Sequence, residues 1–260
     1  MLKNTAREKL KKIFNALGKF YKWTTTWTGA IVVVLFIISF VAQSFVIPSG
    51  SMIRTLLVGD YLFVKKFEYG IPTPHIPWLE IPMIPGVGLK LVDGDRPKRG
   101  DIVVFRKPGQ ENVHFVKRCI ATSGDYVQLI NKNLFVRPVE GDKFIRDNYS
   151  KDMIFEIDGK LWVRNPYQKY FGGIWNDQRV IDDGTQPPQL FNIKPTRVPD
   201  NNFYMMGDNR DHSNDSRFWG SVPYENIEGT PWAIYFSIDE NLTVRWDRMF
   251  RSVDSLQKEF

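Results

Sequence analysis

Two serines lie two positions apart in the hexapeptide IPSGSM, residues 47–52, directly after the long apolar run of the chain. A serine hydroxyl is a weak nucleophile until a neighbouring base removes its proton. Three histidines, His75, His114 and His212, could supply such a base. A lysine could do the same, because burial disfavours its charged form and lowers its pKa. Ser51 is therefore a candidate nucleophile with either kind of partner.

Lys117 is the lysine with the most apolar surroundings in sequence. It lies in VHFVKRCIA, residues 113–121, where strand alternation predicts that Phe115 and Cys119 share its face. Its stem could simply pack while the amine reaches water. Alternatively, the amine is desolvated and acts as a base, and Ser-Lys pairs are a known variant of the catalytic triad.

A third polar stretch is GDNRDHSNDSRFWG, residues 207–220, which has no apolar side chain from Gly207 to Arg217. Taken alone it is typical of a surface loop. The chain has no G-x-S-x-G, no H-E-x-x-H and no Cys/His cluster with zinc spacing. The missing G-x-S-x-G argues against an α/β-hydrolase, and the missing zinc motifs argue against a metallopeptidase.

The elements that must position these residues begin with the uncharged run 28–47, which is long enough to cross a bilayer as a helix. We expect a basic cytoplasmic segment over 1–26 and a single transmembrane helix over 27–47. The positive-inside rule then places the remainder outside the cytoplasm. A cleavable signal peptide ending near 42–44 is the alternative. Residues 10–23 either form a basic amphipathic helix on the inner leaflet or are a solvated flank.

The net charge of +6 is confined to residues 1–22, which hold seven basic side chains and one acidic side chain. The rest of the chain is neutral. A nucleic-acid-binding protein usually carries its basic charge on the folded domain, so this distribution favours a membrane surface and no nucleic acid. One cysteine, Cys119, excludes an internal disulfide, and we expect it to be a buried apolar side chain.

After residue 50 the pattern predicts a mostly β fold with no good amphipathic helix. Residues 131–200 form an irregular or β insertion between the two parts of a β catalytic domain, 48–130 and 201–260. Hairpins should turn at 131–133 and at Asp158-Gly159. The other predicted strands are 61–67, 101–107, 113–121, 203–208, 231–239 and 242–250.

The stretch 71–89 contains five prolines and many large apolar residues, which excludes a central strand. It could cross the core or dip into lipid beside the anchor. We expect the second, with Trp78 in contact with lipid.

Taken together, IPSGSM, TLLVGDYLFVKKFEYG, RGDIVVF, VKRCIATSGD and GDNRDHSNDSRFWG resemble the motifs of bacterial type I signal peptidases, in the same order. The resemblance implies that Ser51 is the nucleophile and Lys117 the general base. Ser49 and the Ser51 N–H would form the oxyanion hole. Further residues implied in support are Ser213, which would orient the lysine amine, Gly207, which would allow a close approach, and the ion pair Asp215–Arg217. Those implied to line the substrate pocket are Ile47, Pro48, Met52, Leu56, Phe115 and Val116.

The same resemblance implies an antiparallel β catalytic domain with a smaller inserted β domain on one membrane helix. The expected activity is endoproteolysis of exported preproteins at small-x-small sites through an acyl-enzyme, in the bacterial plasma membrane and without metal or organic cofactor. The expected partners are preproteins and the lipid bilayer. Two alternatives remain open: a Ser-Lys peptidase with one dedicated substrate, and an inactive membrane-anchored binding module.

Overall fold

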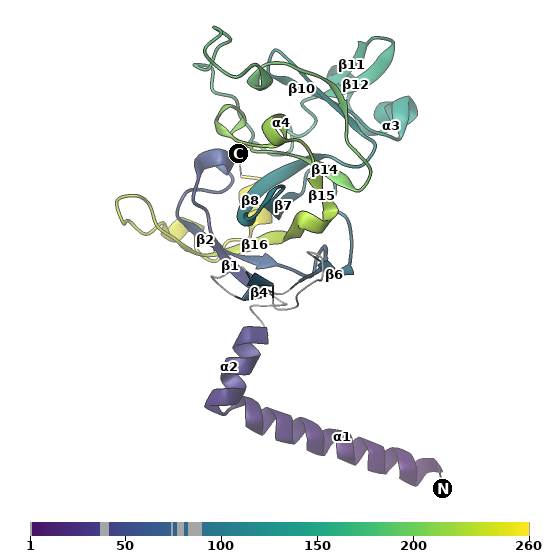
Figure 1. Ribbon diagram of the computed structural model, residues 1–260, viewed down its shortest axis with the longest axis vertical. Helices are drawn as coiled ribbons and strands as arrows, with labels where there is room; N and C mark the ends of the chain where they lie inside the picture. Colours follow the sequence, from purple (N-terminus) through teal and green to yellow (C-terminus); the bar gives the residue numbers. More distant parts are fainter. Residues whose placement is uncertain (1, 37–41, 74, 77–80, 83–89, 260) are drawn as a thin grey trace.

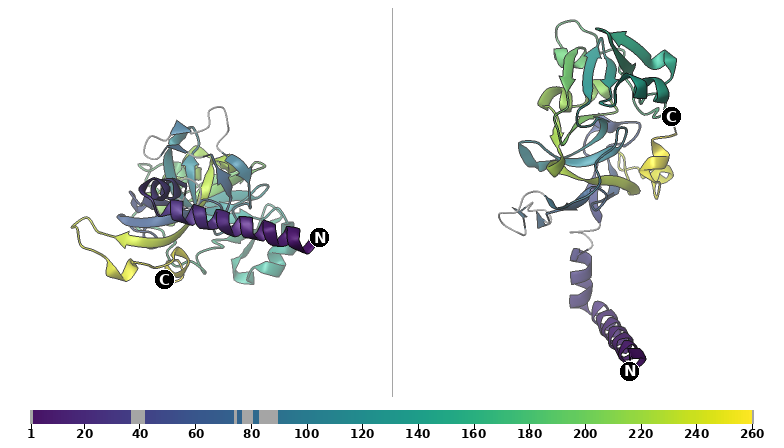
Figure 2. Two further views of the ribbon diagram at one scale, coloured as in Figure 1. Left: turned by 90° about the horizontal axis from the view of Figure 1, so that it is seen from below. Right: turned by 90° about the vertical axis from the view of Figure 1, so that its right-hand side faces the viewer.

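The computed structural model describes residues 2–36, 42–73, 75–76, 81–82 and 90–259. Two helices at the N-terminus extend away from a β-rich body (Figures 1 and 2), whose two main sheets have seven and five strands. The larger sheet lies nearer these helices, and the smaller sheet lies at the far end of the body. The predicted mostly antiparallel β fold is confirmed.

The N-terminal helices are α1 (Leu2–Thr24) and α2 (Trp27–Phe36). In the described ranges, neither they nor any other helix combines the length and apolar character needed to cross a membrane. The prediction of one helix over 27–47 is wrong at its end, because Ala42–Val46 form strand β1. An uncharged apolar run fits a helix or a buried strand equally well. Here β1 satisfies its backbone by antiparallel pairing with β2 (Asp60–Lys65).

The larger sheet has seven strands, one of which carries Lys117. The strand order is β1-β2-β16-β7-β8-β14-β15, and the pairs are antiparallel. Apart from β1 and β2, the strands are β7 (Ile102–Lys107), β8 (Gln110–Ala121), β14 (Asn202–Met206), β15 (Val222–Pro223) and β16 (Ile227–Ser237). Cys119 is fully buried and free, as predicted.

The smaller sheet begins at Tyr126, ahead of the predicted domain boundary at 131. Its strand order is β11-β12-β10-β9-β13. The strands are β9 (Tyr126–Ile130), β10 (Asn133–Arg137), β11 (Ile154–Ile157), β12 (Lys160–Arg164) and β13 (Ile193–Arg197). Both predicted hairpins are confirmed, with positive φ at Asn131 and Lys132 in one turn and at Asp158 and Gly159 in the other.

Two sequence predictions about local structure are wrong. An amphipathic helix does occur after residue 50: α3 (Gly141–Asn148) buries Ile145 beside Met153 and Val163. Residues 242–250 do not form a regular strand. They contain the short helix η7 (Trp246–Arg248), because the Arg248 guanidinium turns inward to the buried Asp60 carboxylate.

The remaining elements are short. The 71–89 stretch contributes parts of two small sheets, and the predicted lipid contact of Trp78 lies outside the described residues. The strands concerned are β3 (Gly70–Pro72), β4 (His75–Ile76), β5 (Ile81–Pro82) and β6 (Lys90–Asp93). Short helices are η2 (Gly50–Met52), η3 (Lys151–Met153), η4 (Pro188–Leu190), η5 (Arg210–His212), α4 (Ser216–Trp219), η6 (Tyr224–Asn226) and α5 (Val253–Leu256).

Candidate active site

Ser51 and Lys117, which are far apart in sequence, lie in direct contact. Ser51 is the middle residue of η2, the single helical turn that follows β1. Lys117 projects from β8, and its Nζ lies 2.6 Å from the Ser51 Oγ. The same Nζ donates to the Val116 carbonyl at 3.0 Å. The pair therefore has the separation that transfer of a proton from hydroxyl to amine requires.

Burial controls the charge of this lysine. The Lys117 side chain is 3% exposed, and loss of hydration lowers its pKa to about 8. The carboxylates of Asp215 and Asp208 act in the opposite direction but are outweighed. A lysine with this pKa has about one amine in ten neutral at pH 7, compared with roughly one in a few thousand in water.

Two groups near the Ser51 hydroxyl could donate hydrogen bonds to a developing negative charge. The Ser49 Oγ is 3.4 Å from the Ser51 Oγ. The Ser51 N–H belongs to the first turn of a helix, where backbone N–H groups have no partner within the helix. Asn209 fixes the turn: its N–H donates to the Ser51 carbonyl at 3.1 Å and its Nδ2 to the Gly50 carbonyl at 3.0 Å.

Gly207 lets residues 207–217, here called the polar loop, pack against η2, here called the serine turn because it carries Ser51. A Cβ at this position would lie 2.3 Å from the Ser213 Oγ and 2.5 Å from the Ser51 carbonyl oxygen, so no side chain fits. The Ser213 hydroxyl is buried near Asp215 without a hydrogen bond of normal geometry to any described residue. The expected bond from Ser213 to Lys117 is not among those that the lysine makes.

Asp215 and Arg217 form a buried ion pair within this loop. The Arg217 Nε donates to one Asp215 oxygen at 2.8 Å and its Nη2 to the other at 2.9 Å. Asp215 also accepts the Gly207 N–H at 3.0 Å, which connects the pair to the close-approach glycine. Burial opposes ionisation of Asp215, but the adjacent guanidinium keeps its pKa below the ordinary value.

Sequence reasoning missed a second buried ion pair next to the lysine. Arg118 binds Asp208 in a bidentate manner at 2.8 and 2.7 Å, and Thr55 donates to the same carboxylate at 2.7 Å. These contacts connect β8, the polar loop and the segment after the serine turn. Arg118 and Asp208 are 90 residues apart in the chain, so no local sequence pattern indicates that they pair. Strand alternation predicts only that Arg118 faces away from Lys117.

Sequence reasoning also missed a strand-like contact that supports the polar loop from outside the large sheet. The Trp175 N–H donates to the Asp208 carbonyl at 3.0 Å, and the Trp175 carbonyl accepts from the Arg210 N–H at 3.1 Å. The Asp211 carboxylate accepts the Asp177 N–H at 2.6 Å and forms an ion pair with Lys132, whose Nζ lies 2.9 Å from the Asp211 Oδ1. Residues 132 and 174–180, which belong to the smaller-sheet part of the chain, therefore hold the loop that carries Ser213.

A cavity of about 320 Å³ opens beside the Ser51 hydroxyl, with Phe45–Ser49 and Met52 on one wall and Val113–Lys117 on the other. Five of the six residues implied as pocket-lining do line it. The exception is Leu56, which is fully buried in the core cluster with Met52 and lines no part of the cavity. The lining is mostly apolar, as suits small apolar side chains of an extended peptide.

The histidines whose side chains are described have partners other than the serine. The His114 Nε2 is 3.1 Å from the Glu228 Oε2, and the His212 Nε2 is 3.2 Å from the Asp177 Oδ2. Within the described parts of the chain, the base that contacts Ser51 is thus a lysine.

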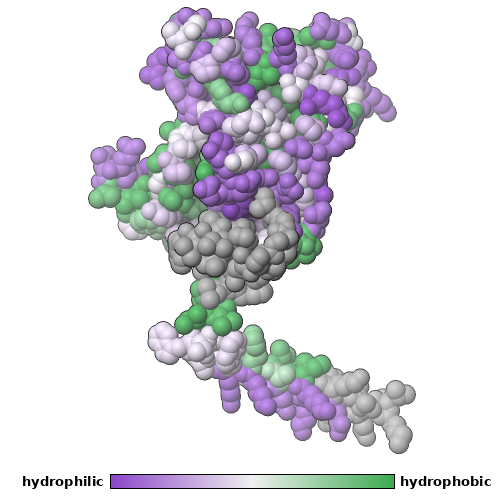
Figure 3. Space-filling model, in the orientation of Figure 1, coloured by the Kyte–Doolittle hydropathy of each residue, from purple (hydrophilic) through white to green (hydrophobic). Residues whose placement is uncertain are grey.

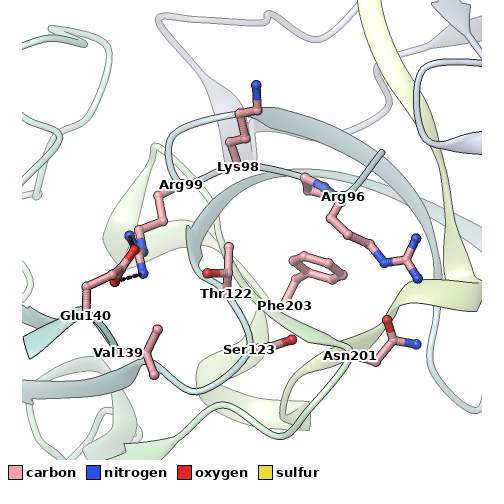
Figure 4. A pocket seen from close by; sticks show the side chains of 10 residues that line it. Arg96, Lys98, Arg99, Thr122, Ser123, Val139, Glu140, Asn201 and Phe203 are labelled. Carbon is pink, nitrogen blue, oxygen red and sulfur yellow. Dashed lines mark hydrogen bonds and ion pairs between the residues drawn. The ribbon is translucent and has the colours of Figure 1, made fainter. Parts of the chain in front are cut away.

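A larger cavity, about 580 Å³, lies elsewhere and shares no lining residue with the one beside Ser51. Figure 4 shows the Arg99 guanidinium paired with the Glu140 carboxylate at its side. Arg99 also binds Asp125, so its charge is already neutralised. Thr122 and Ser123 contribute hydroxyl groups to this cavity, but the lysine that lines it, Lys98, is exposed, unlike Lys117. The smaller cavity is therefore the candidate active site.

A buried lysine amine bonded to a serine hydroxyl beside an apolar cleft is an arrangement that also occurs in serine hydrolases that use lysine as base. The comparisons specify the family. The family described as "Signal peptidase, peptidase S26" matches residues 20–236. Signal peptidase I of Helicobacter pylori (strain ATCC 700392 / 26695) is 41% identical over 93% of this chain and 96% of its own length. Signal peptidase I of Buchnera aphidicola subsp. Acyrthosiphon pisum (strain APS) is 32% identical over 92% and 82%.

The chain therefore belongs to the signal peptidase family, peptidase S26, and is a serine peptidase. The resemblance to bacterial type I signal peptidases is confirmed. A crystal structure of a signal peptidase I from Enterococcus faecalis V583 is 23% identical over 52% of this chain and 97% of that one. Its TM-score of 0.29 is too low for a comparison of folds.

Proposed function

We propose that this chain removes signal peptides from exported preproteins, with Ser51 as nucleophile and Lys117 as general base. The observation that carries the proposal is the 2.6 Å contact between the Lys117 Nζ and the Ser51 Oγ, inside a site that lowers the pKa of the amine to about 8. Family membership supplies the substrate class, because the relatives are signal peptidases.

In the first half-reaction, neutral Lys117 takes the Ser51 proton while the Oγ attacks the scissile carbonyl carbon. The carbonyl oxygen becomes an oxyanion, which the Ser51 N–H and the Ser49 hydroxyl stabilise. Each such donor is worth about 3–4 kcal/mol in the transition state. The tetrahedral intermediate then collapses, the C–N bond breaks, and Lys117 returns the proton to the leaving amine. The signal peptide remains as an ester on Ser51.

In the second half-reaction, Lys117 takes a proton from water, which attacks the ester carbon. Collapse of this intermediate breaks the C–O bond, restores the Ser51 hydroxyl and releases the signal peptide as a carboxylic acid. Ser213 would orient the amine at one of these steps, and Asp215 with Arg217 would hold the loop on which Ser213 lies. Gly207 allows that loop to reach the serine turn.

The substrate would bind as an additional strand. β14 pairs with β8 only from Arg118 onward, so the Val113–Lys117 part of β8 keeps an open edge toward the cavity. β1, on the opposite wall, ends the sheet order. In an extended peptide alternate side chains point to the same side, so the residues at small-x-small positions would enter the cavity together.

We also propose that the N-terminal part attaches the peptidase to a bilayer, with residues 1–26 on the cytoplasmic side and the catalytic part outside. Apolar side chains of α2 support this, since Trp27, Ile31, Val32 and Val34 are all at least half exposed and no described residue covers them. Residues 28–47 contain no charged side chain. Such attachment would hold the cavity near the bilayer from which signal peptides emerge.

The decisive experiment is cleavage of a model preprotein in mild detergent by the wild type, Ser51→Ala and Lys117→Ala, with circular dichroism to verify folding. We expect both variants to lose at least a thousandfold in kcat/KM, as a dyad acts as a unit. A matched control is the triple change His75→Gln, His114→Gln and His212→Gln, which should retain most activity. Near wild-type cleavage by either alanine variant, or a folded but inactive triple variant, would refute the dyad.

Trapping the acyl-enzyme is an independent check. A mechanism-based acylating agent should label the wild type once, and peptide mass mapping should locate the adduct on Ser51. Label on another serine would reassign the nucleophile. Failure of Lys117→Ala to acquire label would show that the lysine acts before the ester forms.

A further inference from the structure

Helix α1 carries an apolar face that the rest of the described chain leaves uncovered. Ile13, Leu17 and Phe20 recur at spacings of four and three, which places them on one side of the helix. Phe14 and Tyr21 lie beside them. All five side chains are more than half exposed. Figure 3 shows this side of α1 in green and the opposite side in purple.

The opposite face is basic. Lys11, Lys12, Lys19 and Lys22 lie there with Asn15, and all are exposed. Over residues 1–22 the sequence has seven basic side chains and a single acidic one, Glu8. A basic, amphipathic helix with large apolar side chains has the composition of a helix that lies in a membrane interface. The excess of positive charge complements anionic phospholipid headgroups.

The chain turns sharply between α1 and α2, at a corner formed by residues 23–29 (Figure 2). The two helices can therefore meet a bilayer in different orientations. The Thr26 Oγ1 donates to the Trp23 carbonyl at 2.6 Å and accepts the Gly29 N–H at 3.2 Å. A Cβ on Gly29 would lie 2.0 Å from the Trp23 carbonyl oxygen, so this approach requires glycine. The corner ends α1 at Thr24 and starts the apolar α2 at Trp27.

We infer that α1 lies along the surface of a bilayer that contains anionic phospholipid, with its apolar face in the acyl boundary and its lysines among the headgroups. With 23 residues it would extend about 35 Å along that surface. This inference rests on the proposed bilayer attachment. It adds a second membrane contact, in which α1 lies parallel to the bilayer surface and binds anionic phospholipid. The Gly29 corner would set the angle between that contact and α2.

The test uses the full chain reconstituted in phosphatidylcholine vesicles with and without phosphatidylglycerol. A spin label is attached at Phe14→Cys on the apolar face and, in a matched variant, at Asn15→Cys on the basic face. Cys119 is fully buried, so the unsubstituted chain should take up little label. In anionic vesicles we expect the label at residue 14 to be accessible to oxygen but shielded from a water-soluble nickel complex, and the label at residue 15 to show the reverse.

Lipid charge is tested by changing the four exposed lysines of the basic face to glutamine. This change should return the residue 14 label to water in anionic vesicles. The control changes the same number of exposed lysines on the smaller-sheet part, Lys143, Lys151, Lys160 and Lys169, and should leave the label shielded.

Three outcomes would overturn the inference. Equal exposure of both labels to water in anionic vesicles would exclude a surface contact. Equal shielding of the residue 14 label with and without phosphatidylglycerol would show that α1 does not require anionic phospholipid. If the shielding of the residue 14 label disappears when the protein is diluted in lipid, the apolar face of α1 packs against a second copy of the chain and not against lipid. Failure of the proposed attachment is distinguishable, because the chain would then not float with vesicles, while Ser51-dependent cleavage is measured separately in detergent.

Discussion

At the scale of single residues, the catalytic proposal depends on the Lys117 amine, which is shielded from water but keeps its hydrogen bond to the Ser51 hydroxyl. Lys117 is surrounded by apolar atoms, yet its Nζ keeps two acceptors, the Ser51 hydroxyl and the Val116 carbonyl. Removing water lowers its pKa, while the acidic groups nearby are already paired with arginines and compensate only in part. The result is an amine with a pKa of about 8, which leaves a usable neutral fraction at pH 7.

The first prediction concerns the pH dependence of cleavage. Because the proposed base must be unprotonated, kcat/KM should rise with pH and level off above a pKa of about 8. Lys117→Arg should be inactive over the same range, since arginine remains protonated. A rate profile of the free enzyme checks this. An acidic limb at the ordinary lysine value of about 10.4 would contradict a desolvated amine.

The second prediction concerns Gly207. Gly207→Ala should reduce kcat at least a hundredfold, because the new methyl must displace the Ser213 hydroxyl or the Ser51 carbonyl, and misplacement by about 1 Å can cost that much. Steady-state kinetics of the folded variant measure the loss. Gly18→Ala is the matched control, since a Cβ there meets nothing within 4 Å. Wild-type kcat for Gly207→Ala would show that the loop can move freely away.

At the scale of elements, the polar loop is held by both sheets. β8 binds it through Arg118 and Asp208, while the segment 174–180 pairs with it in a strand-like manner from the other part of the chain. Lys132 lies at the junction, where its Nζ contacts the Asp177 and Val180 carbonyls and the Asp211 carboxylate. The position of Ser213 therefore depends on residues outside the large sheet.

The third prediction tests this support. Lys132→Met leaves the Asp211 carboxylate buried with one partner fewer, which should lower the stability by about 1–3 kcal/mol. It should also lower kcat more than it raises KM, because the substrate cavity is lined by other residues. Thermal unfolding and steady-state kinetics give both quantities. Lys160→Met, an exposed change in β12, should alter neither. Loss of stability with unchanged kcat would separate the loop support from catalysis.

At the scale of the whole molecule, the desolvated lysine makes the folded state less stable. In the unfolded chain Lys117 has its ordinary pKa of 10.5, whereas in the folded chain the pKa is about 8. Between these values the unfolded state binds the extra proton, so stability should rise with pH across this window. Below pH 8 the full penalty applies, on the order of 3 kcal/mol for a difference of this size.

The fourth prediction follows from this linkage. Lys117→Met should be inactive but more stable than the wild type at pH 7, by about 1–3 kcal/mol once the lost hydrogen bonds are counted. The difference should fall by about 3 kcal/mol as the pH rises to 10.5, and it should change sign there, because the hydrogen bonds that the variant lacks still stabilise the wild type. Denaturant unfolding at pH 7 and at pH 9.5 would measure it. A stability difference that does not change with pH would mean that Lys117 is not desolvated in the folded chain.

Features that depend on neighbouring residues could be predicted from the amino-acid sequence. Runs of β-branched and aromatic residues predicted the mostly β class, and the turn residues near Asn131 and Asp158-Gly159 predicted both hairpins. The order of short motifs indicated the family, which the comparisons confirm. These signals are local, because turn geometry and side-chain alternation are set within a few residues.

The partner of each polar or apolar group, in contrast, depends on contacts between distant segments and became visible in the folded chain. Residues 42–46 are apolar enough for a helix, but pairing with β2 makes them a strand. Residues 242–250 have a strand-like pattern, but the buried Asp60 draws Arg248 inward. Ser51 could have met a histidine or a lysine, and the register of β8 brings it Lys117. Such contacts join segments far apart in the chain, so their energies depend on packing that no local pattern encodes.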